Sequence, residues 1–214
     1  MSDPDFIQHQ AYASRFGAYR AILSRLLNHD PAMFELPPAS QVVDVGCGYG
    51  DLLKTLRARG YEKLVGVEPD PVCREAALNN GLTVREGTLT GTGLPDASAD
   101  AVIVNEVFHH VDNYVRAVDE IARVLKPSGL LCFIEPAPTG LRRMMDFLTF
   151  RTPLPRWVPS VRLRYDVMKL EVETGLYPQF LSQQEGFHNA LARHFKPVWL
   201  RRGWFFQFGK YVLG

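Results

Sequence analysis

The chain has 214 residues, of which 46% are hydrophobic and 22% charged, and its formal net charge is +1. This composition is typical of a globular protein with a sizeable core. The small net charge excludes a strong overall electrostatic attraction to nucleic acid. The three cysteines are isolated and odd in number, which argues against a disulfide framework or a cysteine zinc site. The polar start and the lack of an apolar run of roughly 18 residues predict a cytoplasmic protein of one elaborated domain.

The first segment, residues 1–35, has apolar and aromatic side chains at helical spacing over residues 8–28. We therefore predict an N-terminal helix there, which a proline-rich break at 36–38 ends.

After this break, strand-like and helix-like patterns alternate up to residue 136. Such alternation favours an α/β domain with a parallel sheet and helices on both of its faces. We assign residues 36–136 to this core. Its predicted strands cover 41–45, 63–68, 83–86, 101–105 and 130–135, and its predicted helices cover 51–59, about 71–80 and 113–125.

The periodicity changes beyond residue 136. Residues 136–180 are rich in proline and aromatic residues, and we predict an insertion with one or two helices. Residues 182–194 have helical spacing again, so we assign 137–195 to the insertion and the last helix. Two final strands, 197–201 and 204–212, flank Arg202 and Gly203, so residues 196–214 are predicted to form a β-hairpin.

The most informative motif follows the first predicted strand. Glycine occupies every second position at Gly46, Gly48 and Gly50, directly before a predicted helix. Glycines in such a loop let the backbone approach a ligand closely, and the helix turns its amide groups toward it. Asp44 precedes this loop, and a second acid, Glu68, ends the next strand.

These motifs resemble those of class I S-adenosylmethionine (SAM)-dependent methyltransferases. Residues 94–111, with their His109–His110 pair, and residues 122–130 extend the resemblance to the small-molecule branch, of the methyltransferase type 11 or UbiE-like kind. The resemblance implies a Rossmann-like seven-stranded sheet, mostly parallel, with a C-terminal antiparallel hairpin and helices on both faces. It also implies that S-adenosyl-L-methionine is the cofactor.

Within this family the acid at the end of strand two holds the ribose hydroxyls, and the loop after strand three borders the adenine. Carried over residue by residue, the resemblance implies a SAM site made of Asp44, Gly46, Cys47, Gly48, Gly50, Glu68, Pro69, Thr88, Leu89 and Asn105.

Two residues at strand ends are candidate catalytic groups. His110 is our first candidate for a general base, and Glu135 is the second. A base is needed only if the acceptor arrives protonated. We predict no metal site, because the side chains of adjacent residues such as His109 and His110 are expected to diverge.

The segments outside the core are expected to act on the acceptor. The N-terminal helix is a candidate lid over the cofactor. Residues 140–214 carry 12 Lys and Arg against 5 Asp and Glu, so a segment with Arg142 and Arg143 could recognise an amphiphilic or anionic small molecule. The same mixture of aromatic and basic residues would suit a peripheral membrane contact. We predict no nucleic-acid partner, and the oligomeric state stays open.

Three other functions share some of these features. A nucleotide-dependent oxidoreductase has a similar glycine loop, but Asp51 stands where its third glycine would be. A non-catalytic SAM-binding protein is a second alternative. A methyltransferase that acts on a macromolecule is a third, although the motif typical of amino methylation is absent from residues 105–108.

Overall fold

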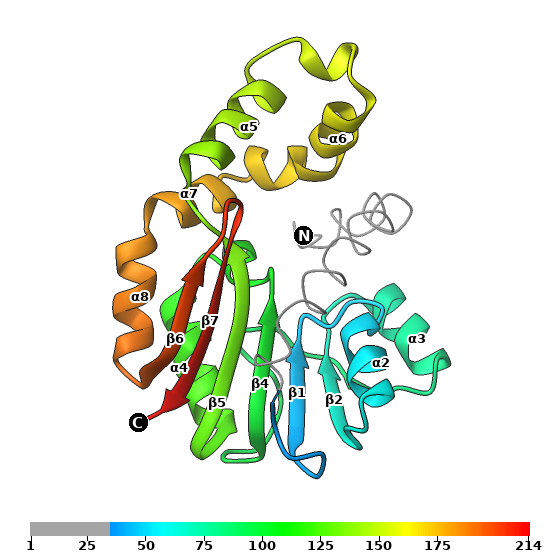
Figure 1. Ribbon diagram of the computed structural model, residues 1–214. Helices are drawn as coiled ribbons and strands as arrows, with labels where there is room; N and C mark the ends of the chain where they lie inside the picture. Colours follow the sequence, from blue (N-terminus) through cyan, green and yellow to red (C-terminus); the bar gives the residue numbers. More distant parts are fainter. Residues whose placement is uncertain (1–34) are drawn as a thin grey trace.

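The computed structural model describes residues 35–214, which form a sheet with helices on both sides and a helical segment above it (Figure 1). The predicted N-terminal helix and lid lie outside the described residues. The sheet has seven strands in the order β3-β2-β1-β4-β5-β7-β6. Its strands are β1 (Gln41–Val45), β2 (Lys63–Val67), β3 (Val84–Arg85), β4 (Ala99–Asn105), β5 (Leu125–Pro136), β6 (Phe195–Arg202) and β7 (Phe206–Leu213).

The first five strands are parallel, and the last two are antiparallel to their neighbours. β1 lies at the centre of the parallel part, where Val43 is in register with Val65 of β2 and Val102 of β4. The order reverses between β1 and β4, and open α/β sheets bind ligands outside the carboxyl ends of the strands at such a switch point.

Two apolar clusters fill the faces of the sheet because alternate residues of each strand point to opposite sides. On one face, Val43 and Val102 belong to the cluster of α4 (Tyr114–Val124) and α8 (Gln184–Ala192). On the other, Val42 and Ile103 belong to the cluster of α2 (Asp51–Ala58) and α3 (Pro71–Asn79). The predicted seven-stranded fold with helices on both faces is therefore confirmed.

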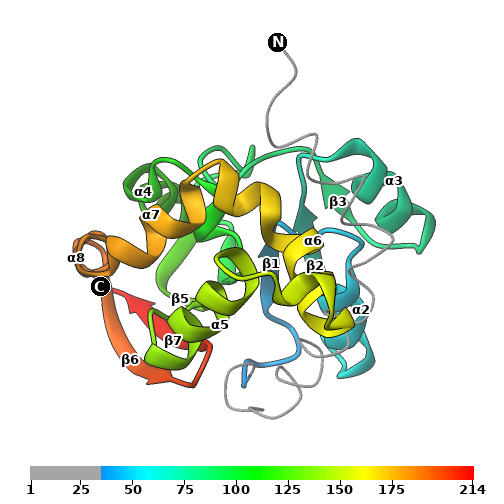
Figure 2. The ribbon, with the colours of Figure 1, turned by 90° about the horizontal axis from the view of Figure 1, so that it is seen from above.

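Helices between β5 and β6 form a segment that we call the cap, residues 137–182. It contains α5 (Gly140–Phe150), the 3₁₀ helix η3 (Leu154–Arg156), α6 (Pro159–Glu173) and α7 (Leu176–Ser182). Figure 2 shows α5 and α6 above the end of the sheet, between the two helical layers. The cap is more helical than predicted, because its prolines stand at helix starts, where they are tolerated.

Element boundaries differ from the predictions by a few residues. β5 already begins at Leu125, directly after α4, instead of at Leu130. β6 is longer than predicted, whereas β7 begins two residues later than predicted and ends one residue later. Gly203 donates its N–H to Phe206 O at 2.7 Å across the turn. Within residues 35–214, no helix combines the length and apolar character that crossing a membrane would require.

Candidate functional site

The glycine loop lies between β1 and α2, at the carboxyl edge of the sheet. Gly46, Gly48 and Gly50 all have positive φ, at 75°, 51° and 74°. A Cβ at Gly46 would lie 2.4 Å from Val107, whereas a Cβ at Gly48 would have no atom within 4 Å. The loop is therefore packed at one glycine and open at the next, which leaves backbone accessible to a ligand.

Glu68 connects this loop to the end of β2. Its Oε2 accepts the N–H of Gly48 at 2.8 Å, and its Oε1 accepts the N–H of Asp70 at 3.0 Å. The side chain is buried. Because a carboxylate can accept about four hydrogen bonds, Glu68 can hold both backbone segments and still accept bonds from a diol.

Asp44 and Cys47 are buried beside the loop. Burial, and then the nearby charge of Glu68, raise the pKa of Asp44 to about 7. Burial also raises the pKa of the Cys47 thiol, and the two acids add to this effect. Cys47 is therefore a packing residue of the loop and not a reactive thiolate.

The remaining predicted cofactor residues lie around the same edge. Pro69 and Thr88 are exposed, and Leu89 is buried within the apolar cluster of α4 and α8. The Oδ1 atom of Asn105, at the end of β4, is buried and finds no hydrogen-bond partner in the described part of the chain. Since buried polar atoms are nearly always paired, this atom is a candidate acceptor for a ligand donor.

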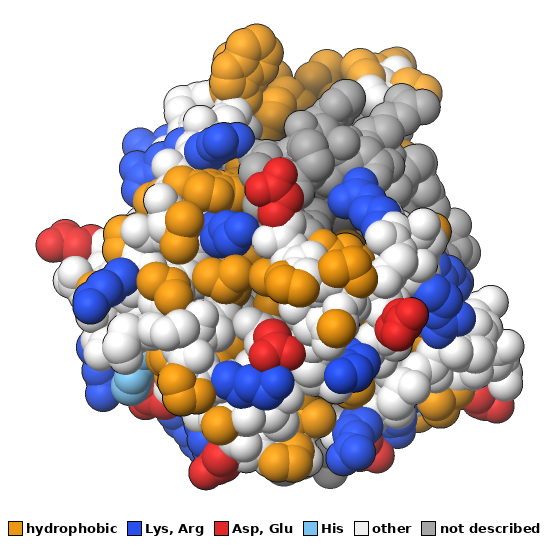
Figure 3. Space-filling view, turned by 60° about the horizontal axis from the view of Figure 1, so that its bottom comes forward, with side chains coloured by type: hydrophobic (Ala, Val, Ile, Leu, Met, Phe, Trp, Pro, Cys, Tyr) orange, Lys and Arg blue, Asp and Glu red, His pale blue; other side chains and the backbone are white. Residues whose placement is uncertain are grey.

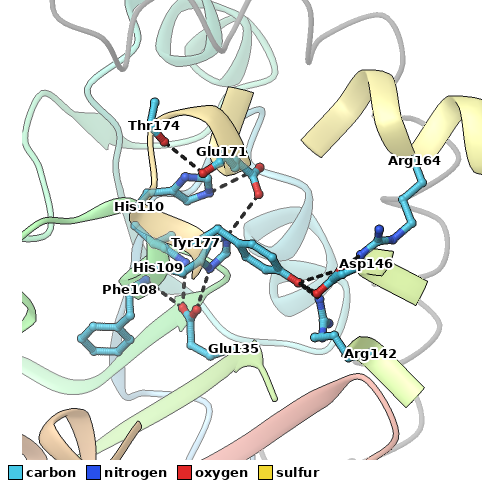
Figure 4. A network of polar contacts seen from close by, with 11 residues as sticks. Phe108, His109, His110, Glu135, Arg142, Asp146, Arg164, Glu171, Thr174 and Tyr177 are labelled. Atoms are coloured by element: carbon cyan, nitrogen blue, oxygen red, sulfur yellow. Dashed lines mark hydrogen bonds and ion pairs between the residues drawn. The ribbon is translucent and has the colours of Figure 1, made fainter. Parts of the chain in front are cut away.

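Glu135 holds the backbone that follows β4 and is completely buried. Its Oε1 accepts the N–H groups of Val107 and Phe108, both at 2.8 Å, and its Oε2 lies 2.7 Å from His109 Nδ1. Figure 4 shows the carboxylate facing these groups. With its oxygens occupied in this way, Glu135 is placed to position the loop and not to reach a substrate.

The prediction that His109 and His110 diverge is wrong. The segment Phe108–His110 is a 3₁₀ helix, η2, and not a strand. Its two imidazole rings lie with centroids 4.1 Å apart and planes 36° from parallel. Both rings face Glu171 of α6, with His109 Nε2 3.7 Å from Oε2 and His110 Nε2 4.0 Å from Oε1. The reason is that a tight helical turn brings neighbouring side chains closer in direction than a pleated strand does.

His109 is a buried histidine between two carboxylates. Burial alone would lower its pKa, but the carboxylates of Glu135, which contacts Nδ1, and of Glu171 outweigh it and raise the pKa to about 10. His110 is partly accessible, with 23% of its side chain exposed. Of the pair, His110 is therefore the one that an acceptor could reach.

Two acids of this site were not found from the sequence. Glu171 lies on the cap, where only its tertiary contact with the histidines reveals it. Glu106 follows β4 with a positive φ of 57°, and burial raises its pKa to about 7. A non-glycine residue in this conformation is strained and is often found at a functional site; its acidic side chain gave no such signal in sequence.

Comparison with known proteins agrees with this geometry. Residues 43–133 match the family model described as methyltransferase domain. This stretch of the chain is similar to a methyltransferase domain. The resemblance noted from the glycine loop and the strand-four motif is thereby confirmed. The matched part runs from within β1 to within β5 and includes the glycine loop, Glu68, Asn105 and the histidine pair.

Three proteins that this chain resembles carry the name methyltransferase. An uncharacterised methyltransferase of Mycobacterium bovis is 41% identical over 45% of this chain and 40% of its own. A demethylmenaquinone methyltransferase of Deinococcus radiodurans is 32% identical over 65% of this chain and 58% of its own. A SAM-dependent methyltransferase of Mesorhizobium loti has the same fold, with a TM-score of 0.58, 17% identity and coverage of 85% of this chain and 96% of its own. The chain thus spans only 40% of the length of the Mycobacterium relative and 58% of that of the Deinococcus relative.

Proposed function

We propose that this protein is a SAM-dependent methyltransferase whose acceptor is a small molecule. The observation that carries the proposal is the hydrogen bond between Gly48 N–H and Glu68, because it joins an open glycine loop to a buried acid at the switch point of the sheet. The residues present fit the cofactor, since Gly48 leaves room for it and Asn105 Oδ1 offers an acceptor without a partner among residues 35–214.

The SAM-binding residues are those expected from the resemblance. Glu68 would accept the ribose hydroxyls, the backbone of Gly46–Gly50 would approach the cofactor, and Asn105 would accept a donor from it. Pro69, Thr88 and Leu89 would border the base, with Asp44 and Cys47 supporting the loop from beneath. Bound SAM supplies a methyl group that its sulfonium already activates, so the protein mainly aligns the acceptor with it.

In this proposal, His110 is the general base that removes a proton from the acceptor. Its Nε2 would accept a proton from a hydroxyl or enol acceptor, and the carboxylate of Glu171, 4.0 Å away, would favour the resulting cation. Glu135 acts as a positioning residue, because it holds the two backbone amides before His109 and the ring of His109 itself.

The cap supports an amphiphilic or anionic acceptor. Met144, Phe147 and Trp157 are exposed large apolar side chains on it. Arg143, Arg151 and Arg156 are exposed as well, and none forms an ion pair with an acid of the described residues. Apolar and cationic groups side by side suit a molecule with an apolar body and an anionic group, or an anionic membrane surface that presents it.

A small acceptor is also supported by the charge distribution. The net charge is +1, and on the face seen in Figure 3 basic and acidic side chains are interspersed. Binding of nucleic acid favours a continuous basic surface. The relative from Deinococcus radiodurans is named for a quinone acceptor, which is likewise a small molecule.

Calorimetry and a methyl-transfer screen test the proposal. The protein should bind SAM but not NADH. Glu68→Ala should weaken SAM binding by about 2–3 kcal/mol, the range for hydrogen bonds to a charged group, whereas Glu86→Ala, which removes an exposed acid nearby, should not. SAM with a labelled methyl group, offered with acceptors in solution and in anionic vesicles, should label a small product. Binding of NADH in place of SAM would contradict the cofactor, and SAM binding without transfer to any acceptor would favour a non-catalytic protein.

A further inference from the structure

His109, His110 and Glu171 form a cluster of nitrogen and oxygen donors between the core and the cap. We propose that this cluster binds a divalent transition-metal ion of the zinc class. One ring nitrogen of each histidine and a carboxylate oxygen of Glu171 all lie within 4.8 Å of one another. The histidines come from η2 and the acid from α6, so an ion here would connect the cap to the sheet (Figure 4).

The donor distances leave space for an ion. Glu171 lies 3.7 Å from His109 Nε2 and 4.0 Å from His110 Nε2, and both distances are longer than a hydrogen bond. Zinc binds nitrogen and oxygen at about 2.0–2.2 Å, which places tetrahedral donors about 3.3–3.5 Å apart. The two distances to Glu171 therefore have to close by a few tenths of an ångström, and the donor set as a whole, which lies within 4.8 Å, by up to roughly 1.4 Å to reach coordinating positions.

His109 is oriented as metal-binding histidines are. Its Nδ1 lies 2.7 Å from Glu135, and two backbone amides hold that carboxylate in turn. Such a carboxylate behind the ring holds the ring orientation and directs Nε2 toward the ion. In this protein Nε2 is directed at Glu171.

Local charge also favours a dication. Glu135 and Glu171 are both buried, and both lie beside His109. Buried carboxylates need nearby positive charge or metal coordination. Two imidazoles and one carboxylate suit zinc, cobalt or ferrous iron better than magnesium or calcium, which prefer oxygen ligands. The partly exposed side of His110 would leave a fourth position for water or an acceptor oxygen.

The metal site and the proton-accepting role of His110 exclude each other at any one moment, because Nε2 cannot hold a metal ion and accept a proton. This inference uses the proposed function only for that consequence, and its test is independent of methyl transfer. Binding of the ion would release the proton of His109 Nε2.

The test is a titration of the untagged full-length protein with Co²⁺, which gives a visible absorption band when bound by nitrogen and oxygen ligands, followed by competition with Zn²⁺. We expect one Co²⁺ per chain, displaced by Zn²⁺. Glu171→Gln and His110→Ala should each weaken binding at least tenfold, and Glu135→Gln should weaken it about 10–100-fold through His109. His194→Ala, which removes a histidine that pairs with Asp119 on α4's side of the sheet, should leave binding unchanged.

The wild-type titration alone can overturn the inference. Without saturable Co²⁺ binding in a protein that melts cooperatively and binds SAM, the cluster is an ion-pair network and no metal site. Equal Co²⁺ affinity in wild type and folded Glu171→Gln would place the ion elsewhere and would equally reject the site. If the wild-type protein binds Co²⁺ but not SAM, the result contradicts the proposed function and still supports the metal site.

Discussion

The glycines of the loop after β1 serve different purposes at different residues. Gly46 is required by packing, because a Cβ there would meet Val107 at 2.4 Å. No atom lies within 4 Å of a Cβ at Gly48, so packing does not require glycine at this position. Only the positive φ of Gly48 and a bound ligand could require it. Gly60, which follows α2, also has positive φ and open space around it. Gly60 therefore provides a matched control for the substitution of Gly48.

Gly48→Ala should weaken SAM binding while the protein stays folded. The methyl group would enter the space from which the cofactor approaches, and we expect a loss of about tenfold in affinity, or about 1.4 kcal/mol. Gly60→Ala should have the same cost in stability, about 1–2 kcal/mol for a left-handed alanine, and unchanged SAM affinity. Calorimetry and thermal melting of both variants measure this. Equal SAM affinity in the two variants would remove Gly48 from the cofactor site.

In the metal-free protein, His109 should make the free energy of unfolding depend on pH. Its folded pKa, about 10, lies above its unfolded value, so its contribution is complete below about pH 6.5 and is lost as pH rises toward 10. From about pH 7 to about pH 8.5 the free energy of unfolding should fall by up to about 1.4 kcal/mol per pH unit. His109→Gln should lack this slope in denaturant titrations. If both proteins lose stability in parallel, His109 is not held as a cation.

At the scale of elements, the cap is held to the sheet by buried polar contacts from α5. Arg142 donates from Nε to Phe205 O at 2.7 Å and from Nη1 to Tyr177 Oη at 2.9 Å. Its guanidinium carbon also lies 4.9 Å from the ring centroid of Phe206. Arg142 is therefore a structural contact among α5, α7 and the hairpin. The hypothesis that Arg142 recognises the charge of the acceptor conflicts with this burial, and of the pair Arg142 and Arg143 only the exposed Arg143 keeps that role as a prediction.

Arg142→Ala should loosen the cap, whereas Arg143→Ala should not. The first change removes hydrogen bonds from a charged, buried donor and should reduce the free energy of unfolding by about 2–3 kcal/mol. The second removes an exposed side chain and should stay within about 0.5 kcal/mol. Urea titration and limited proteolysis of residues 137–182 measure the difference. A stable Arg142→Ala protein with a raised KM only for anionic acceptors would restore the charge-reading hypothesis.

At the scale of the whole molecule, the cap connects β5 and β6, two strands of the same sheet. The N-terminal segment, residues 1–34, is not among the described residues. The lid hypothesis rests on Tyr12, Phe16 and Tyr19, which recur at helical spacing in the sequence. It remains a prediction.

Deletion of residues 1–20 should reduce SAM affinity and turnover by about tenfold each, or about 1.4 kcal/mol, because a lid excludes water and retains the ligand. The remaining sheet should keep its circular dichroism spectrum and cooperative melting. Normal binding and turnover by this folded truncated protein would show that the segment is no lid.

Much of the fold followed from local pattern. The strand Gln41–Val45 was predicted with the bounds that the structure has, and Pro71 starts its helix as expected, with Asp70 as the cap that accepts Cys73 N–H. The glycine loop and Glu68 were also identified, because apolar periodicity, turn glycines and strand-end acids are encoded by neighbouring residues.

Contacts between distant segments were decided only by the tertiary structure. Nothing near Glu171 in the sequence indicates that it faces His109 and His110, and nothing near Arg142 indicates that Phe205 and Tyr177 bury it. Many side chains pack between the cap and the sheet, and this packing determines which acidic and basic residues are buried next to one another. Burial in turn decides which of them are anchors, such as Glu135, and which stay accessible, such as His110. Local sequence determines where helices and strands form, but the long-range packing of these elements determines the chemistry of the site.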